Sequence, residues 1–148
     1  MPTVLIIDDD QATRTALEML LKKKKFGVFL APDGPTGIRL VGSVSFDAVV
    51  IDMFMPGMDG LATIRELIKI DPTVPFIAIS GYAFTDRRQG GPDFLGMAIK
   101  LGATAALQKP FDILDLLEAV DRAVDVRQQL LAGAPQVGSD SPSVRKAS

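Results

Sequence analysis

Five short aliphatic runs alternate with amphipathic segments along most of the 148-residue chain, and this alternation limits the possible folds more than any other feature. The runs are strand-sized and occupy residues 3–7, 28–31, 48–51, 76–79 and 105–107. Several of them are apolar without alternation, which is typical of parallel strands that helices cover on both faces. Strict β–α alternation therefore predicts an α/β fold with a doubly wound, five-stranded parallel sheet and right-handed crossovers.

The segments between the runs carry signals for helix ends. Pro35 suits the first position of a helix, and Pro72 must end one. Asp10, Asp59 and Asp112 are expected to cap helices. The predicted apolar faces are Ala12, Ala16, Leu17, Leu20 and Leu21 in the first helix, and Ile113, Leu116, Leu117, Val120 and Val124 in the last.

The domain organisation follows from where these patterns stop. Residues 1–125 are predicted to form one domain, with the last helix extending to about residue 132. Residues 133–148 are rich in Ser, Pro and Gly, which indicates a disordered C-terminal tail. No second domain is expected, so the prediction is a stand-alone domain.

Composition excludes several classes of protein. The chain has no cysteine and no histidine, which excludes disulfide scaffolds, thiol and imidazole catalysis, and imidazole or thiolate metal sites. No apolar run approaches the roughly 20 residues that span a bilayer, and the N-terminus lacks the features of a signal peptide, so a cytoplasmic protein without membrane contact is expected. The net charge of −2 and the lack of a basic face with interleaved aromatics argue against direct nucleic-acid binding.

Polar residues stand where the predicted strands end. Asp8 and Asp9 follow the first run, Asp52 the third, Ser80 the fourth, and Lys109 comes just after the fifth. Because ligands of such sheets bind beyond the carboxyl ends of the strands, these groups are expected to converge on one rim. Three carboxylates in one cleft repel one another, and Mg²⁺ is the hard cation that best relieves this repulsion. With the lysine and the hydroxyl, the set suits in-line attack by a carboxylate on phosphorus.

At these residues the sequence resembles the receiver domain of bacterial two-component response regulators. The matching segments are residues 4–10, 49–60, 77–81, 102–103 and 108–111, in the family's order and spacing. The resemblance covers residues 3–125 and implies a flavodoxin-like fold with strand order 2-1-3-4-5.

The resemblance also implies roles for the residues. Asp52 would be the phosphoacceptor, and Mg²⁺ would be held by Asp8, Asp9, Asp52 and the backbone carbonyl of Phe54. Ser80, Gly81 and Lys109 would bind the phosphoryl group. Ser80 would also act as the conformational switch, and the Lys109–Pro110 peptide would be cis.

The implied partners are a sensor histidine kinase or a histidine phosphotransfer domain, whose phosphohistidine would supply the phosphoryl group, followed by an unidentified downstream protein. The expected kinase-docking surface combines the first helix with the loop after the last strand, through Thr13, Arg14, Leu17, Pro110 and Phe111. The protein is expected to be a monomer or a phosphorylation-dependent dimer. Its role would be signalling, although it would catalyse its own phosphorylation and dephosphorylation.

Among the departures from the family pattern are the residue at the switch position and the length of one segment. The aromatic switch residue that usually stands three positions before the lysine is replaced by Ala106, so the output is coupled in another way or the conformational change is smaller. The segment 82–95 is also longer than usual and contains the charged, glycine-rich stretch 86–92. That stretch is either a tolerated surface loop or a lid or partner-recognition loop.

Two alternatives stay open. Asp8-Asp9-Asp10 after an aliphatic strand is similar to the nucleophile motif of haloacid-dehalogenase-like phosphatases, in which Asp8 would be the nucleophile and Asp10 the acid–base. That interpretation leaves Asp52 without a role, and Ala12 stands where threonine or valine is usual. The other alternative, suggested by Ala106, is an interaction module that works without phosphorylation.

Overall fold

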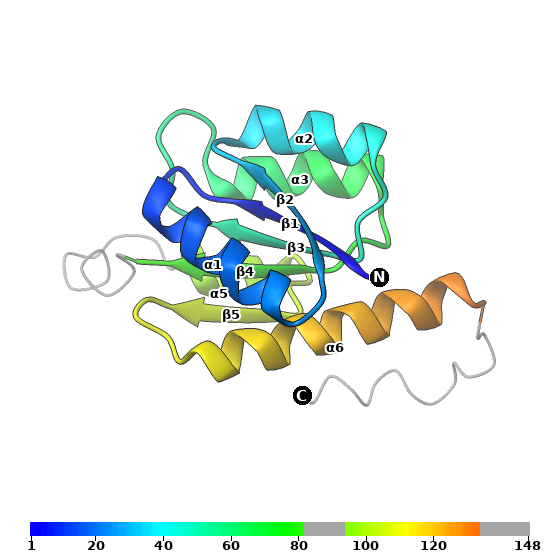
Figure 1. Ribbon diagram of the computed structural model, residues 1–148. Helices are drawn as coiled ribbons and strands as arrows, with labels where there is room; N and C mark the ends of the chain where they lie inside the picture. Colours follow the sequence, from blue (N-terminus) through cyan, green and yellow to red (C-terminus); the bar gives the residue numbers. More distant parts are fainter. Residues whose placement is uncertain (82–93, 134–148) are drawn as a thin grey trace.

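The computed structural model describes residues 1–81 and 94–133 and has an α/β architecture with a five-stranded parallel sheet (Figure 1). The strands lie in the order β2-β1-β3-β4-β5, which confirms the predicted fold. The elements in chain order are β1 (Thr3–Ile7), α1 (Gln11–Lys23), β2 (Gly27–Ala31), α2 (Gly34–Ser43), β3 (Ala48–Asp52), α3 (Gly60–Ile70), β4 (Phe76–Ser80), α5 (Phe94–Lys100), β5 (Ala105–Gln108) and α6 (Ile113–Leu131).

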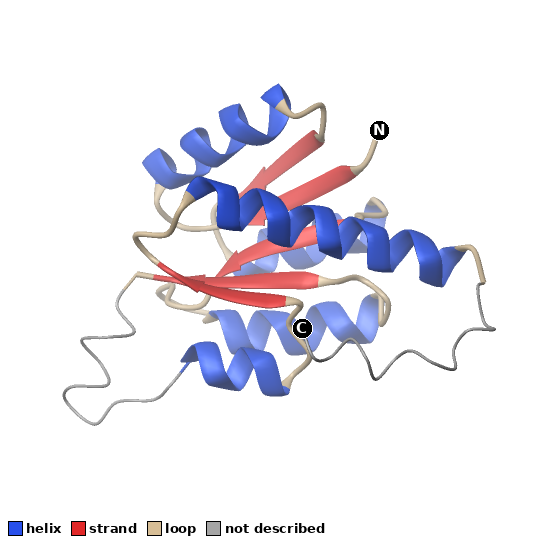
Figure 2. Cartoon of the chain, turned by 90° about the horizontal axis from the view of Figure 1, so that it is seen from below, coloured by secondary structure: helices blue, strands red, loops and turns tan. Residues whose placement is uncertain are grey.

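The sheet is buried on both faces because its central strands are apolar except for Thr3 at the start of β1 and the polar residues that end β3 and β4. Alternate side chains of β1 and β3 enter different cores, as expected for a strand repeat of two residues. Leu5 and Val49 pack with α2, α3 and α5, whereas Val4 and Val50 pack with α1 and α6. The two helical layers are visible on opposite faces of the sheet (Figures 1 and 2).

An aspartate caps each of the four helices α1, α2, α3 and α6. The side chains of Asp10, Asp59 and Asp112 accept hydrogen bonds from backbone N–H groups in the first turns of α1, α3 and α6, as predicted. Asp33 does the same for α2, a cap that the sequence analysis missed. Gly133 follows α6 with φ 69°, a left-handed conformation suited to glycine at a helix end.

The apolar faces of α1 and α6 are narrower than predicted. Ala12 and Ala16 are exposed, and Ile113 is 49% exposed. Leu17 and Leu21 carry most of the contact of α1 with the core. Ala12, Ala16 and Ile113 have the correct helical spacing, but spacing does not show how far along a helix the packing neighbours extend.

A buried arginine ties α6 to the amino-terminal edge of the sheet. Arg127 is 3% exposed. Its guanidinium donates hydrogen bonds to Asp71 Oδ2 at 2.7 Å, Thr73 Oγ1 at 2.9 Å and Ser45 Oγ at 2.8 Å. Ser45 precedes β3, and Asp71 and Thr73 precede β4, so the helix is anchored at the edge opposite the polar strand ends.

Two expectations lie wholly or mostly outside the described residues. They are the lid or recognition role of the long segment 82–95, of which residues 82–93 are not described, and the disordered tail, of which residues 134–148 are not described. Among the helices that the structure does describe, none is both long and apolar enough to cross a bilayer.

Candidate functional site

The carboxyl-terminal edge of the sheet gathers the polar residues expected there. Asp52 and Ser80 are the last residues of β3 and β4, Asp8 and Asp9 follow β1, and Lys109 follows β5. The strand register makes this convergence possible, because Ile7 pairs with Ile51 and Ser80 pairs with Gln108. Asp8 therefore follows the residue that pairs with Ile51, and Asp52 follows Ile51 itself. Lys109 follows the residue that pairs with Ser80.

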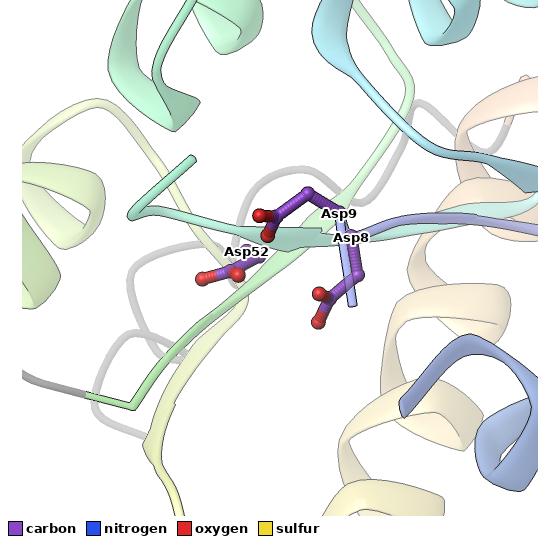
Figure 3. Close-up of side chains that lie close together, drawn as sticks. All are labelled: Asp8, Asp9 and Asp52. Atoms are coloured by element: carbon purple, nitrogen blue, oxygen red, sulfur yellow. The ribbon is translucent and has the colours of Figure 1, made fainter. Parts of the chain in front are cut away.

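Three carboxylates form the centre of the site (Figure 3). Asp8, Asp9 and Asp52 each offer an oxygen, and these oxygens lie within 4.8 Å of one another. Asp8 and Asp52 are buried, at 0% and 5% exposure, whereas Asp9 is exposed. Such a cluster concentrates negative charge in a region of low solvent access and favours binding of a cation.

Lys109 brings a positive charge to this cluster. Its Nζ lies 3.2 Å from Asp8 Oδ2 and 4.0 Å from Asp52 Oδ2. The Lys109–Pro110 peptide is cis, as the resemblance implied. The lysine chain passes close to Gly81, because a Cβ at that position would lie 3.4 Å from Lys109 Cδ, in ordinary van der Waals contact. In the described part of the chain, this ammonium group forms ion pairs with two of the three clustered carboxylates, Asp8 and Asp52.

This environment alters the pKa of Asp52. Burial is the largest cause and raises the pKa of Asp52 to about 7, with the charges of Asp8 and Asp9 acting in the same direction. The backbone N–H of Phe54, which donates to Asp52 Oδ1 at 3.1 Å, and the Lys109 charge oppose the increase. In the metal-free protein, Asp52 therefore binds a proton near neutral pH.

Ser80 places a hydroxyl group at the end of the neighbouring strand. The residue is 1% exposed, and its Oγ has no hydrogen-bond partner among the described residues. An unpaired buried hydroxyl is unfavourable unless a ligand satisfies it. Because the neighbouring strand β3 ends in Asp52, the Ser80 hydroxyl is available to a group bound at the Asp52 carboxylate.

The site opens into a cleft of about 920 Å³. Its walls come from the loops after β1, β3, β4 and β5, and the lining residues are Asp9, Asp10, Thr13, Asp52, Phe54, Met55, Pro56, Gly81, Lys109 and Pro110. Asp52 is therefore reachable from solvent although its side chain is mostly buried. Asp8 does not line the cleft.

The five residues expected to dock a kinase fall into different environments. Thr13 and Pro110 line the cleft, and Phe111 is half-buried against the α1–α6 core. Leu17 is 6% exposed and belongs to that core, so its side chain is not available for docking. The half-buried Arg14 donates a 2.7 Å hydrogen bond to the Asp8 carbonyl, a contact that the sequence analysis did not predict.

The donor set fits a hard divalent cation. The three clustered groups are all carboxylates, which Mg²⁺ prefers, and within residues 1–81 and 94–133 Lys109 is the residue that forms ion pairs with them. The Phe54 N–H is directed to Asp52 Oδ1; the role of the Phe54 carbonyl as a ligand stays a prediction.

Ala106, which stands at the position of the aromatic switch residue, is half-buried in β5, against the core on the α5 side of the sheet.

Comparison with known proteins identifies the family of this sequence. Residues 4–121 match the model of the response regulator receiver domain family. The response regulator MprA from Mycobacterium sp. (strain KMS) is 32% identical over 141 residues, which cover 95% of this chain and 56% of MprA. The chain thus spans about half the length of this relative.

Solved structures show the same architecture. A response regulator receiver domain protein from Clostridium thermocellum superposes with a TM-score of 0.76 at 30% identity, covering 88% of this chain and 99% of that one. The receiver domain of a sensor histidine kinase from Pseudomonas aeruginosa gives a TM-score of 0.71 at 25% identity, covering 84% and 98% of the two chains. That structure has a magnesium ion coordinated in its active-site cleft.

Proposed function

This chain belongs to the response regulator receiver domain family, and from this premise we propose that Asp52 accepts a phosphoryl group from a phosphohistidine. The donor is a sensor histidine kinase or a histidine phosphotransfer domain. A carboxylate oxygen of Asp52 forms the new bond to phosphorus as the N–P bond of the donor breaks, and the electron pair returns to the imidazole. The resulting acyl phosphate then changes which protein the domain binds.

The observation that carries this proposal is the surroundings of Asp52. Its carboxylate ends β3 in an open cleft, near the Lys109 ammonium group and the carboxylates of Asp8 and Asp9. Lys109 offsets negative charge on the transferred group, and the unpaired Ser80 hydroxyl donates a hydrogen bond to it. Gly81 keeps the approach free of a side chain.

Mg²⁺ is the proposed cofactor, and Asp8, Asp9 and Asp52 are its proposed protein ligands, together with the Phe54 carbonyl. When bound, it would neutralise charge on the phosphoryl oxygens. The chain's own contribution is to hold the carboxylates in a cluster that is costly without a cation, because two of them are buried.

The phosphatase alternative is disfavoured by the position of Asp8. That side chain is 0% exposed, and its two oxygens accept hydrogen bonds from the Asp10 N–H at 2.9 Å and from Lys109 Nζ at 3.2 Å. A nucleophile that attacks an external phosphate ester must be accessible to it. Asp52 meets this requirement better, because it lines the cleft.

The decisive experiment is phosphorylation of the purified chain by acetyl phosphate with Mg²⁺, followed by peptide mass spectrometry. An adduct of about 80 Da is expected at Asp52, absent in Asp52→Asn and present in Asp121→Asn, a matched change at an exposed position of α6. An adduct on Asp8, or none on the wild-type chain under conditions that label a known receiver, would reject the proposal. Phosphotransfer profiling against the histidine kinases of the host would then identify the donor.

A further inference from the structure

Arg14 connects the start of α1 to the backbone of the acidic cluster. Its Nη1 donates a 2.7 Å hydrogen bond to the carbonyl oxygen of Asp8, and the contact is partly buried. We propose that Arg14 is a positioning residue for the divalent cation: it fixes the peptide group between Asp8 and Asp9 and thereby places the Asp9 carboxylate. This inference rests on the metal-dependent function proposed above.

The hydrogen bond from Arg14 completes the anchoring of Asp8. The Asp8 N–H donates to the Ala31 carbonyl at 3.1 Å, and its carboxylate accepts from the Asp10 N–H and from Lys109. The carbonyl is the remaining polar group of the residue, and Arg14 binds it. Because a peptide unit is planar, holding this carbonyl also fixes the orientation of the Asp9 N–H and the direction in which the chain enters Asp9.

Asp9 is the carboxylate that most needs this support. Its side chain is exposed and, among the described residues, forms no hydrogen bond or ion pair. By contrast, Asp8 is bound by two donors and Asp52 by the Phe54 N–H. The position of the Asp9 carboxylate therefore depends on its backbone, whose preceding peptide Arg14 holds.

A docking role alone would not require this geometry. A residue that contacts a kinase is expected to present its charged group to solvent, but the guanidinium of Arg14 is directed to the Asp8 carbonyl. The two roles also differ in what they affect. Docking changes phosphotransfer from a protein donor only, whereas positioning changes cation affinity in the isolated chain.

The test compares Mg²⁺ binding by wild type, Arg14→Met, Arg14→Lys and Arg65→Met, the last a matched arginine substitution at an exposed position of α3. The dissociation constant is measured by titrating backbone amide resonances with Mg²⁺ alone. Loss of a group that orients a metal ligand weakens affinity by about 10- to 100-fold. We expect a loss of about tenfold in Arg14→Met, recovery of most of it in Arg14→Lys, and no change in Arg65→Met.

The sign of the change separates positioning from simple charge repulsion. If Arg14 acted only as a cation near the site, its removal would tighten Mg²⁺ binding, and that result would overturn the inference. Unchanged affinity, combined with a normal rate of phosphorylation by acetyl phosphate and a slower rate from a kinase, would assign Arg14 to docking instead.

A second measurement needs no variant and covers the case in which Arg14→Met does not fold. The side-chain Nε resonance of Arg14 in the wild-type chain is expected to shift as Mg²⁺ saturates the site, while that of Arg65 stays in place; an unmoved Arg14 signal would overturn the inference. Failure of the proposed function is distinguishable, because it would leave Asp52 unphosphorylated in the wild-type chain whatever the effect of Arg14 on Mg²⁺ binding.

Discussion

Burial and the carboxylates of Asp8 and Asp9 raise the pKa of Asp52 to about 7, from an ordinary value of 3.8. The folded chain therefore holds a proton at this residue between about pH 4 and 7, where the unfolded chain has already lost it. Stability must fall as the pH rises through this window, because the folded state binds more protons than the unfolded state. Above pH 7 the folded state carries a buried negative charge that it has to tolerate.

We therefore expect Asp52→Asn to be more stable than wild type at pH 8 in EDTA, by about 2–4 kcal/mol, with little difference at pH 4. Urea unfolding at both pH values measures the effect, and saturating Mg²⁺ should reduce the difference at pH 8. A wild-type chain whose stability does not change between pH 4 and 8 relative to Asp52→Asn would show that the carboxylate is not protonated in the folded state.

For the Ser80 hydroxyl, we expect a substitution that preserves stability but slows phosphorylation. Because its Oγ is buried without a partner, Ser80→Ala should leave the free energy of unfolding unchanged or raise it by about 1 kcal/mol. The same variant should accept a phosphoryl group from acetyl phosphate more slowly, since it loses a donor to the transferred group. A clear loss of stability in thermal unfolding would mean that the hydroxyl has a structural partner.

The clustering of the site residues could be predicted from the sequence, whereas the hydrogen bonds that hold them in place could not. Asp52, Ser80 and Lys109 lie at one rim because parallel strands end at the same edge of a sheet, and short apolar runs show where the strands end. The hydrogen bond from Arg14 to the Asp8 carbonyl depends on how α1 enters after its cap at Asp10. The spacing of apolar residues in the sequence does not predict the direction in which α1 leaves its cap.

Among the elements, strands could be located more precisely than helix faces. An apolar run marks a buried strand directly, and the predicted runs differ from the observed strands by at most one residue at each end. A helical repeat predicts which side of a helix is apolar, but not which residues on that side are buried. Ala12, Ala16 and Ile113 have the right spacing but stay largely exposed, because coverage depends on tertiary packing.

Helix α6 ends at Leu131, close to residue 132, where the last helix was predicted to end, and beyond residue 125, the predicted end of the domain; Arg127 lies in this last part of the helix. A chain that ends at residue 125 would lose the arginine that binds Asp71, Thr73 and Ser45. Breaking a buried, hydrogen-bonded charge pair costs about 3–5 kcal/mol. We expect this truncation to lower the free energy of unfolding by at least about 3 kcal/mol, and truncation after residue 133 to leave it unchanged.

Point variants separate the arginine from the rest of the helix. Arg127→Met should reproduce most of the loss seen on truncation at residue 125, whereas Arg122→Met, at an exposed position paired with Glu118 at 3.7 Å, should change stability by less than about 1 kcal/mol. Equal stability of the chains that end at 125 and 133 in urea would place the domain boundary before Arg127.

At the scale of the whole molecule, Ala106 bears on how far a change at Asp52 is expected to travel. It lies in β5, paired with Ala78 of β4 and half-buried on the α5 side of the sheet. A methyl group at this position has no alternative rotamer, so the side chain of residue 106 cannot respond to a change at Ser80 by swinging inward. Coupling between distant sites requires an element with two discrete arrangements, and residue 106 does not supply one.

Beryllofluoride, a phosphoryl mimic, should therefore change hydrogen exchange mainly in the segments that line the cleft, and little along β5 and α5. Ala106→Tyr introduces a ring that can occupy two positions, so we expect its exchange changes to spread to β5 and α5. Ala105→Tyr, whose side chain belongs to the α6 side of the sheet, is the matched control and should behave like wild type. If wild-type β5 and α5 already respond to beryllofluoride, the signal crosses the molecule without an aromatic switch. If no segment responds although the mimic binds, the domain is better explained as an interaction module that works without phosphorylation.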